Sequence, residues 1–229
     1  PLLQPVYEAR NDWQRLIGVF QVRVDTSDTD DEQVAWHYKI AELYEQAGET
    51  PELAFEHYVA AAVVDPGRES TLEQLLRLAD VLDCHRDLVG HMQALVDEIG
   101  DDMRRRETHR ILASLCRDRA GDLEGTEMHL RALLEIDQRD MPAIDALIHL
   151  YRDQQNTARL VDMLLSKAPM VDDQHEGNSL FAEAGSLCAT ALEAPDRAIE
   201  IYESLHQRDR EGHVALDALE VLYQRHSLV

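Results

Sequence analysis

Residues 41–66 constrain the fold of this chain most, because two apolar stripes at helical spacing follow each other directly in and around this stretch. The first stripe consists of Ile40, Leu43, Tyr44 and Ala47, and the second of Ala54, Phe55, Tyr58, Ala61 and Ala62. Gly48 is expected to end the first helix, Pro51 suits the first turn of the next helix, and Pro66 ends it. The stretch therefore predicts two short helices packed against each other.

The same pair of helices recurs along the whole chain. Counterparts of Tyr44 in the first helix of each pair are Tyr7, Leu82, Cys116, Tyr151, Cys188 and Tyr223. Counterparts of Tyr58 in the second helix are Phe20, Leu95, Leu130, Leu164 and Tyr202. Neighbouring members of both series are 34 to 38 residues apart. Two series with one shared spacing are typical of a helical repeat array, so we predict an all-α fold with 12 or 13 helices.

The repeats predict a single array over residues 1–229, with partial units at residues 1–25 and 212–229. The complete units are expected at residues 30–66, 69–99, 103–137, 141–168 and 172–208. The second helix of the unit at 69–99 is expected at about residues 86–99, with the apolar stripe Leu88, Met92, Leu95 and Ile99, and the next unit is expected to begin with a helix at residues 103–120. Because the last unit has a first helix and no second, we expect its apolar residues Leu219, Leu222 and Tyr223 to be uncovered. The chain is thus interpreted as a piece of a longer protein, or as one that self-associates through its uncapped ends.

The pattern of residues 41–66 resembles the tetratricopeptide repeat (TPR) family, which has a small and an aromatic residue in its first helix. In the second helix the family has alanine, an aromatic residue and alanine, and a proline closes the repeat. The matching residues here are Ala41, Tyr44, Ala54, Tyr58, Ala61 and Pro66. One extra residue between Gly48 and Ala54 departs from the pattern. The resemblance implies a TPR-like α-solenoid, in which antiparallel helix pairs stack into a right-handed superhelix.

The resemblance also implies a concave groove lined by one face of each first helix. At the corresponding positions we expect a partner to contact Tyr38, Glu42, Asp80, Asp83, Arg110, Arg117, His149 and Arg152. Some TPR domains hold the terminal carboxylate of a partner with lysines and asparagines at such positions. This chain has neither residue type there, so that mode of binding is not expected.

The expected lining changes sign along the chain, from acidic near Glu42 to basic near Arg117 and Arg152. The planar guanidinium group suits carboxylates, so the basic part could hold an acidic segment of a partner peptide or helix. The alternative is that the arginines pair with neighbouring acids such as Asp118 and Asp153.

Composition argues against several other classes of protein. The 45 acidic residues exceed the 22 lysines and arginines, giving a net charge of −23 that repels nucleic acids and anionic lipids. No apolar run of about 18 residues predicts a membrane-spanning helix. Three cysteines, Cys84, Cys116 and Cys188, are expected to be reduced and to act as small apolar residues, which favours a cytoplasmic location.

No catalytic motif is visible, so we predict a protein that is not an enzyme and needs no cofactor or metal. The acidic segments at residues 25–32 and 172–177 lack the ligand spacing of a metal site and are interpreted as polar helix starts. Eleven histidines include two pairs at equivalent repeat positions, His37 with His109 and His57 with His129. They are interpreted as packing or surface residues, and a pH-dependent role stays open because free histidine titrates near about 6.5.

These observations favour a non-catalytic scaffold that binds a protein partner, a peptide or a helix, along its concave face. Two alternatives remain open at this point. The array could be a sensory or regulatory peptide-binding module that controls an attached effector domain, or a spacer within a large assembly.

Overall fold

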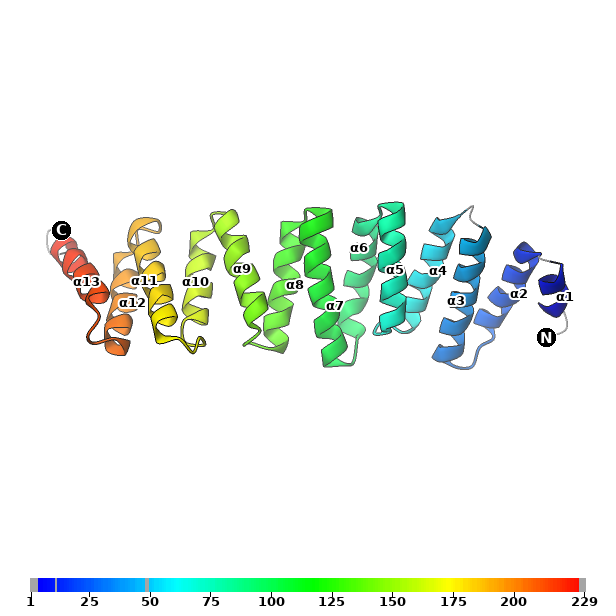
Figure 1. The fold of residues 1–229 in the computed structure, drawn as a ribbon, viewed down its shortest axis with the longest axis horizontal. Helices are drawn as coiled ribbons and strands as arrows, with labels where there is room; N and C mark the ends of the chain where they lie inside the picture. The colour runs from blue at the N-terminus through cyan, green and yellow to red at the C-terminus, as the bar shows by residue number, and fades with distance from the viewer. Residues whose placement is uncertain (1–3, 11, 48–49, 227–229) are drawn as a thin grey trace. The chain divides into compact units, whose positions relative to one another are not determined.

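The computed structural model describes residues 4–10, 12–47 and 50–226 of the chain, and these form α-helices joined by short turns (Figure 1). The α-helices are α1 (Gln4–Ala9), α2 (Trp13–Asp25), α3 (Asp30–Ala47), α4 (Pro51–Val64), α5 (Glu69–Leu82), α6 (His85–Leu95), α7 (Asp102–Leu115), α8 (Leu123–Ile136), α9 (Met141–Asp153), α10 (Thr157–Lys167), α11 (Gln174–Thr190), α12 (Pro195–Arg208) and α13 (His213–His226). A 3₁₀ turn, η1 (Val96–Glu98), follows α6, and a π-helical turn, η2 (Cys116–Ala120), follows α7. The all-α prediction with 12 or 13 helices is therefore confirmed for the described residues.

The chain divides into two compact units, unit 1 (Pro1–His129) and unit 2 (Leu130–Val229). Within unit 1, each helix from α1 to α6 packs against the next helix along the chain. Within unit 2, the same holds from α9 to α13. Neighbouring helices run in opposite directions, so both units consist of consecutive antiparallel pairs, as the repeat pattern predicts (Figure 1). A single array over residues 1–229 and its handedness stay predictions.

The pair formed by α3 and α4 follows the sequence pattern closely. Ala41 and Ala54 are completely buried, which lets the two backbones approach, and Tyr58 is buried beside them. Pro51 begins α4 as expected, where its missing N–H has no helical partner to lose. Helix α3 ends at Ala47, while the predicted stop at Gly48 lies outside the described residues.

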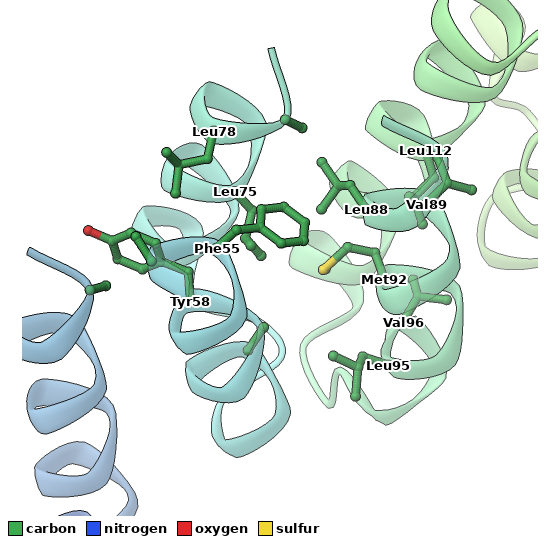
Figure 2. Packing of buried hydrophobic residues seen from close by; sticks show 14 of the residues in the cluster. Phe55, Tyr58, Leu75, Leu78, Leu88, Val89, Met92, Leu95, Val96 and Leu112 are labelled. Atoms are coloured by element: carbon green, nitrogen blue, oxygen red, sulfur yellow. The ribbon is translucent and has the colours of Figure 1, made fainter. Parts of the chain in front are cut away.

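The core of unit 1 continues from α4 through α5 and α6 to α7. Phe55 of α4 points toward Leu88 and Met92 of α6, which are buried together with Leu75 and Leu112 (Figure 2). The predicted second-helix stripe of Leu88, Met92, Leu95 and Ile99 is buried in full. The helix itself is shorter than the predicted 86–99, because α6 ends at Leu95 and the tighter turn η1 carries the chain to Ile99.

The prediction of one helix over residues 103–120 is wrong in its last turn, which is π-helical. Gly121 has a φ of +64°, and the N–H of Asp122 donates to the carbonyl of Cys116 over 2.8 Å. This left-handed glycine closes the wide turn without steric strain. A Cβ at Gly125 would lie 3.0 Å from Cys116 Sγ, so α8 passes close to the turn only because residue 125 is glycine.

The expectation of an uncovered last helix needs a correction. Leu219 and Leu222 are each only 8% exposed, because the face of α13 that carries them and Ala215 packs against α12. Tyr223 is 46% exposed as predicted, and its hydroxyl donates to Glu203 Oε1 over 2.7 Å.

Candidate protein-binding surface

Tyr38 contributes more to packing between helices than to the exposed surface. Its hydroxyl lies 3.0 Å from Ser70 Oγ and 2.9 Å from Thr71 Oγ1, which ties α3 to the start of α5. Its ring meets the ring of Tyr58 edge to face, with centroids 5.1 Å apart. The side chain is therefore half-buried and held in place, so only part of its ring is accessible to a partner.

The acidic residues predicted for the groove in unit 1 are all exposed. Glu42 lies on the outer surface of α3. Asp80, near the end of α5, lies 3.0 Å from His85 Nε2 and 3.4 Å from an Arg119 nitrogen. Asp83 follows α5 in a left-handed conformation with φ of 53°, and its side chain is fully exposed. These carboxylates thus remain accessible from solvent, although Asp80 already contacts His85 and Arg119.

The basic residues predicted for unit 1 are exposed and paired with acids nearby. Arg110 lies 3.5 Å from Glu107, one turn earlier on α7. Arg117 donates to both carboxylate oxygens of Asp118, at 2.7 and 3.1 Å. This hydrogen bonding raises the pKa of Arg117 and lowers the pKa of Asp118, so both groups stay charged. The turn η2 carries Arg117, and the spacing of apolar residues did not predict its π geometry.

Two predicted residues lie in unit 2. His149 is exposed on α9. Arg152 donates to Glu183 Oε1 on α11 over 2.6 Å, so its partner is on the next first helix rather than the adjacent Asp153. The sequence left open whether these arginines pair with acidic residues. In the structure both Arg117 and Arg152 do, and the ion pair of Arg152 joins two first helices.

A pocket that the sequence did not predict lies in unit 1 among α1, α2 and α3. It has a volume of about 330 Å³, and its lining includes Tyr7, Trp13, Phe20, Lys39 and Glu42. The sequence feature that could have indicated this pocket is the presence of three aromatic residues close together near the start of the chain. Glu42 is therefore both a predicted contact residue and part of the wall of a hollow with aromatic sides.

A smaller pocket of about 250 Å³ lies in unit 2 and is lined by residues of α11 and α13 and by Leu205 of α12. Asn178 lines it and donates through Nδ2 to Asp209 over 3.0 Å, while its buried Oδ1 has no hydrogen-bond partner among the described residues. Ala182 of α11 also borders the pocket.

The end helix α13 carries apolar residues on both flanks of its packed face. These are Val214, Leu216, Val221 and Tyr223, each between 43% and 60% exposed. The predicted self-association through end helices stays a prediction.

The structure places the cysteines in packing positions. Cys116 and Cys188 are completely buried, and Cys84 is half-buried. Burial raises the pKa of Cys116 to about 11, so its sulfur stays protonated and unreactive. Among the described residues, no three histidine, cysteine or carboxylate side chains lie together in a way that could hold a metal ion.

No helix in the part of the chain that the structure describes is both long and apolar enough to cross a membrane.

These helix pairs define a class, an all-α repeat protein of TPR-like architecture. Among solved structures, a tetratricopeptide repeat protein from Parabacteroides merdae is similar over 96% of this chain and 82% of its own, with 16% identity and a TM-score of 0.32. No protein-family model matches the chain. No curated protein matches it either. The architecture therefore rests on the helix pairing within the chain itself.

Proposed function

We propose that the chain is a protein-interaction scaffold whose first helices bind an extended peptide or a helix of a partner protein. The observation that supports this is the exposure of the predicted contact residues. All of them except the half-buried Tyr38 are exposed, although they lie on or directly after helices whose opposite faces are buried. A series of charged side chains on paired helices offers an extended surface for recognition.

The surface ion pairs make this surface adaptable. The side chains of Arg117 and Arg152 are 56% and 42% exposed, and exposed ion pairs typically contribute only about 0–1 kcal/mol. A carboxylate of a partner can replace Asp118 or Glu183 at small cost, because the guanidinium group is already held at the surface. Arg117 in unit 1 and Arg152 in unit 2 are therefore each proposed to bind an acidic residue of a partner.

The experiment is capture of a partner from a lysate of the source organism by the chain and by the double variant Arg117→Glu/Arg152→Glu. Capture by the unchanged chain and loss in the variant is the expected result, because charge reversal repels an acidic segment. The matched control is Arg15→Glu/Arg210→Glu, which reverses two exposed arginines outside the first-helix surface.

Circular dichroism of all three proteins separates loss of binding from loss of fold. Equal capture by the folded double variant and the unchanged chain would place the partner elsewhere on the molecule and contradict this site. Equal loss in the control variant would show that net charge, rather than the two positions, governs binding.

A further inference from the structure

Two histidine pairs join first and second helices in unit 1 in the same way. In pair 1, the Nδ1 atoms of His37 on α3 and His57 on α4 are 3.1 Å apart. In pair 2, the Nδ1 atoms of His109 on α7 and His129 on α8 are 3.0 Å apart. The two members of pair 2 follow those of pair 1 by 72 residues each, so the contact recurs two repeats later.

The geometry of both pairs is that of a hydrogen bond. Ring centroids are 5.4 Å apart in pair 1 and 5.3 Å apart in pair 2, with interplanar angles of 40° and 45°. Each nitrogen–nitrogen distance lies within the range of an N–H···N hydrogen bond. Among the described residues no third histidine, cysteine or carboxylate joins either pair to form a metal site, so the pairs are interpreted as hydrogen bonds between imidazoles.

Such a bond tolerates one added proton and not two. In the neutral pair, one Nδ1–H donates to the bare Nδ1 of the other ring. When one ring is protonated, its N–H can still donate to the neutral ring. When both are protonated, two N–H groups and two positive charges face each other at this distance, and the bond is lost.

The surroundings of pair 1 oppose that second proton. His37 is 8% exposed, and the ring of Tyr44 stacks on His57 with centroids 5.8 Å apart. From α2, the carboxylate of Asp25 favours the charged form of His37, but burial outweighs it and lowers the pKa of that ring. Burial first, and then the charge of His37, lower the pKa of His57 to about 4.

Pair 2 has the same character with different neighbours. His129 is 1% exposed, and its Nε2 lies 3.4 Å from the amide nitrogen of Gln93 on α6. Asp122, before α8, and Asp97, in η1, favour the charged ring. Burial and the charge of His109 outweigh them and lower the pKa of His129 to about 4.

We propose that the two histidine pairs form an acid-sensitive switch that loosens α3 from α4 and α7 from α8 when each pair takes up its second proton. The switch does not depend on the proposed partner. An opened pair exposes imidazoles with an ordinary pKa of about 6.5, so the open state binds more protons than the closed state between that pH and about 4. The stabilisation is complete above this window and is lost as the pH falls through it.

The test is hydrogen exchange of the full chain, read by mass spectrometry at pH 7.5 and pH 5.0 and corrected for the intrinsic effect of pH. Protection of α3, α4, α7 and α8 is expected to fall by the order of tenfold per pair relative to α9–α12, as linkage of one proton predicts. In His57→Gln/His129→Gln this excess loss should shrink, since a neutral amide can bond the remaining Nδ1 at either pH and each pair then takes up at most one proton. The control is His175→Gln/His213→Gln, which changes two exposed histidines of unit 2 and should behave as the unchanged chain.

An equal change in both sets of helices in the unchanged chain, or an undiminished excess loss in the His57/His129 variant, would overturn the proposal. If that variant fails to fold, an NMR titration of the histidines in the unchanged chain decides the question. Two rings that titrate well below pH 5 support the switch, and a full set of rings that titrate near pH 6.5 refutes it.

Discussion

Two repeats of unit 1 differ from the repeats of unit 2 in the chemistry of equivalent positions. In unit 1, these positions hold His37 with His57 and His109 with His129, while the repeat between them holds Leu75 with Ala94. In unit 2, the equivalent positions hold Ile144 with Met163 and Phe181 with Ile201. Ile144 is completely buried and Ile201 is 6% exposed, so the positions face the core there as well. The repeat decides where a side chain points, and the residue placed there decides whether the contact responds to pH.

The aromatic positions of the second helices show a related difference. Tyr58 of unit 1 lies near Ala41 and donates its hydroxyl to Glu45 over 3.1 Å. In unit 2, the ring of Tyr202 lies against Gly185, and its hydroxyl donates to the carbonyl of Ala182 over 3.3 Å. Replacing the small residue by glycine lets the ring rest on the backbone. The contact at Gly185 leaves no space for a side chain.

The largest effect is therefore expected from Gly185→Ala. A Cβ there would lie 2.8 Å from two ring carbons of Tyr202, closer than such contacts occur. Overpacking costs up to about 3 kcal/mol and the gain in helix propensity is about 1 kcal/mol, so unit 2 should lose about 2 kcal/mol of unfolding free energy. Denaturant unfolding monitored by circular dichroism measures the loss.

The matched control is Gly90→Ala in α6, where no atom lies within 4 Å of the added Cβ. This variant should gain about 0.4–1 kcal/mol because only the flexibility of the unfolded chain is reduced. The same sign for both variants would contradict the tight contact between Gly185 and Tyr202.

The next largest effect on stability is expected when residues of unit 2 are placed at the equivalent positions of unit 1. His109→Ile/His129→Met gives unit 1 the residues that unit 2 has at Ile144 and Met163. The free energy of unfolding of this variant minus that of the unchanged chain should increase by about 1.4 kcal/mol from pH 7.5 to pH 5. This change corresponds to one tenfold factor in the unfolding equilibrium. Chemical denaturation at both pH values measures it, and parallel pH profiles of the two proteins would refute the role of pair 2.

A smaller effect is expected at an ion-pair cluster that belongs to unit 2. Lys167 Nζ lies 2.8 Å from Asp145 and 3.3 Å from Glu176, and its side chain is 15% exposed. Its hydrogen bond to Asp145 raises the pKa of Lys167, so this stabilisation is present below the ordinary lysine pKa and disappears as the pH rises above the folded value. Lys167→Met should cost about 0.5–1 kcal/mol at pH 7 and less in high salt, as thermal unfolding at two ionic strengths would show.

The smallest effect is expected for Arg152→Gln. Its bond to Glu183 joins two first helices at an exposed site, where loss of an ion pair costs less than about 0.5 kcal/mol. A loss above 1 kcal/mol in denaturant unfolding would mean that the pair is structural and would weaken the proposal that it exchanges with a partner.

Much of the helical architecture could be predicted from the sequence. The stripe of Leu88, Met92, Leu95 and Ile99 predicted the buried face of α6 and η1, and Pro51 predicted the start of α4. The helical spacing of apolar residues is a local property of the sequence, because it needs only that each helix buries one face against its partner in the pair. The π turn at Cys116 was not predictable in this way, since it depends on how close α8 passes at Gly125.

The candidate surface stays a prediction, and the structure adds the exposure and the pairing of its residues. Glu42 and His149 are exposed. Tyr38 is half-buried, and its hydroxyl lies within hydrogen-bond distance of Ser70 and Thr71 on α5, which the spacing did not indicate. The sequence also named Asp153 as an alternative partner for Arg152, where the structure has Glu183 from another helix.

By itself, then, the sequence determined which residues form helices and which face of each helix is buried, because both follow from periodicity within one repeat. The tertiary structure alone decided which side chains meet across helices. The bond between His109 and His129, the ring of Tyr202 on Gly185 and the pairing of Arg152 with Glu183 all join residues at least 17 positions apart. Such contacts depend on the distance and rotation between packed helices, which the spacing of apolar residues does not specify.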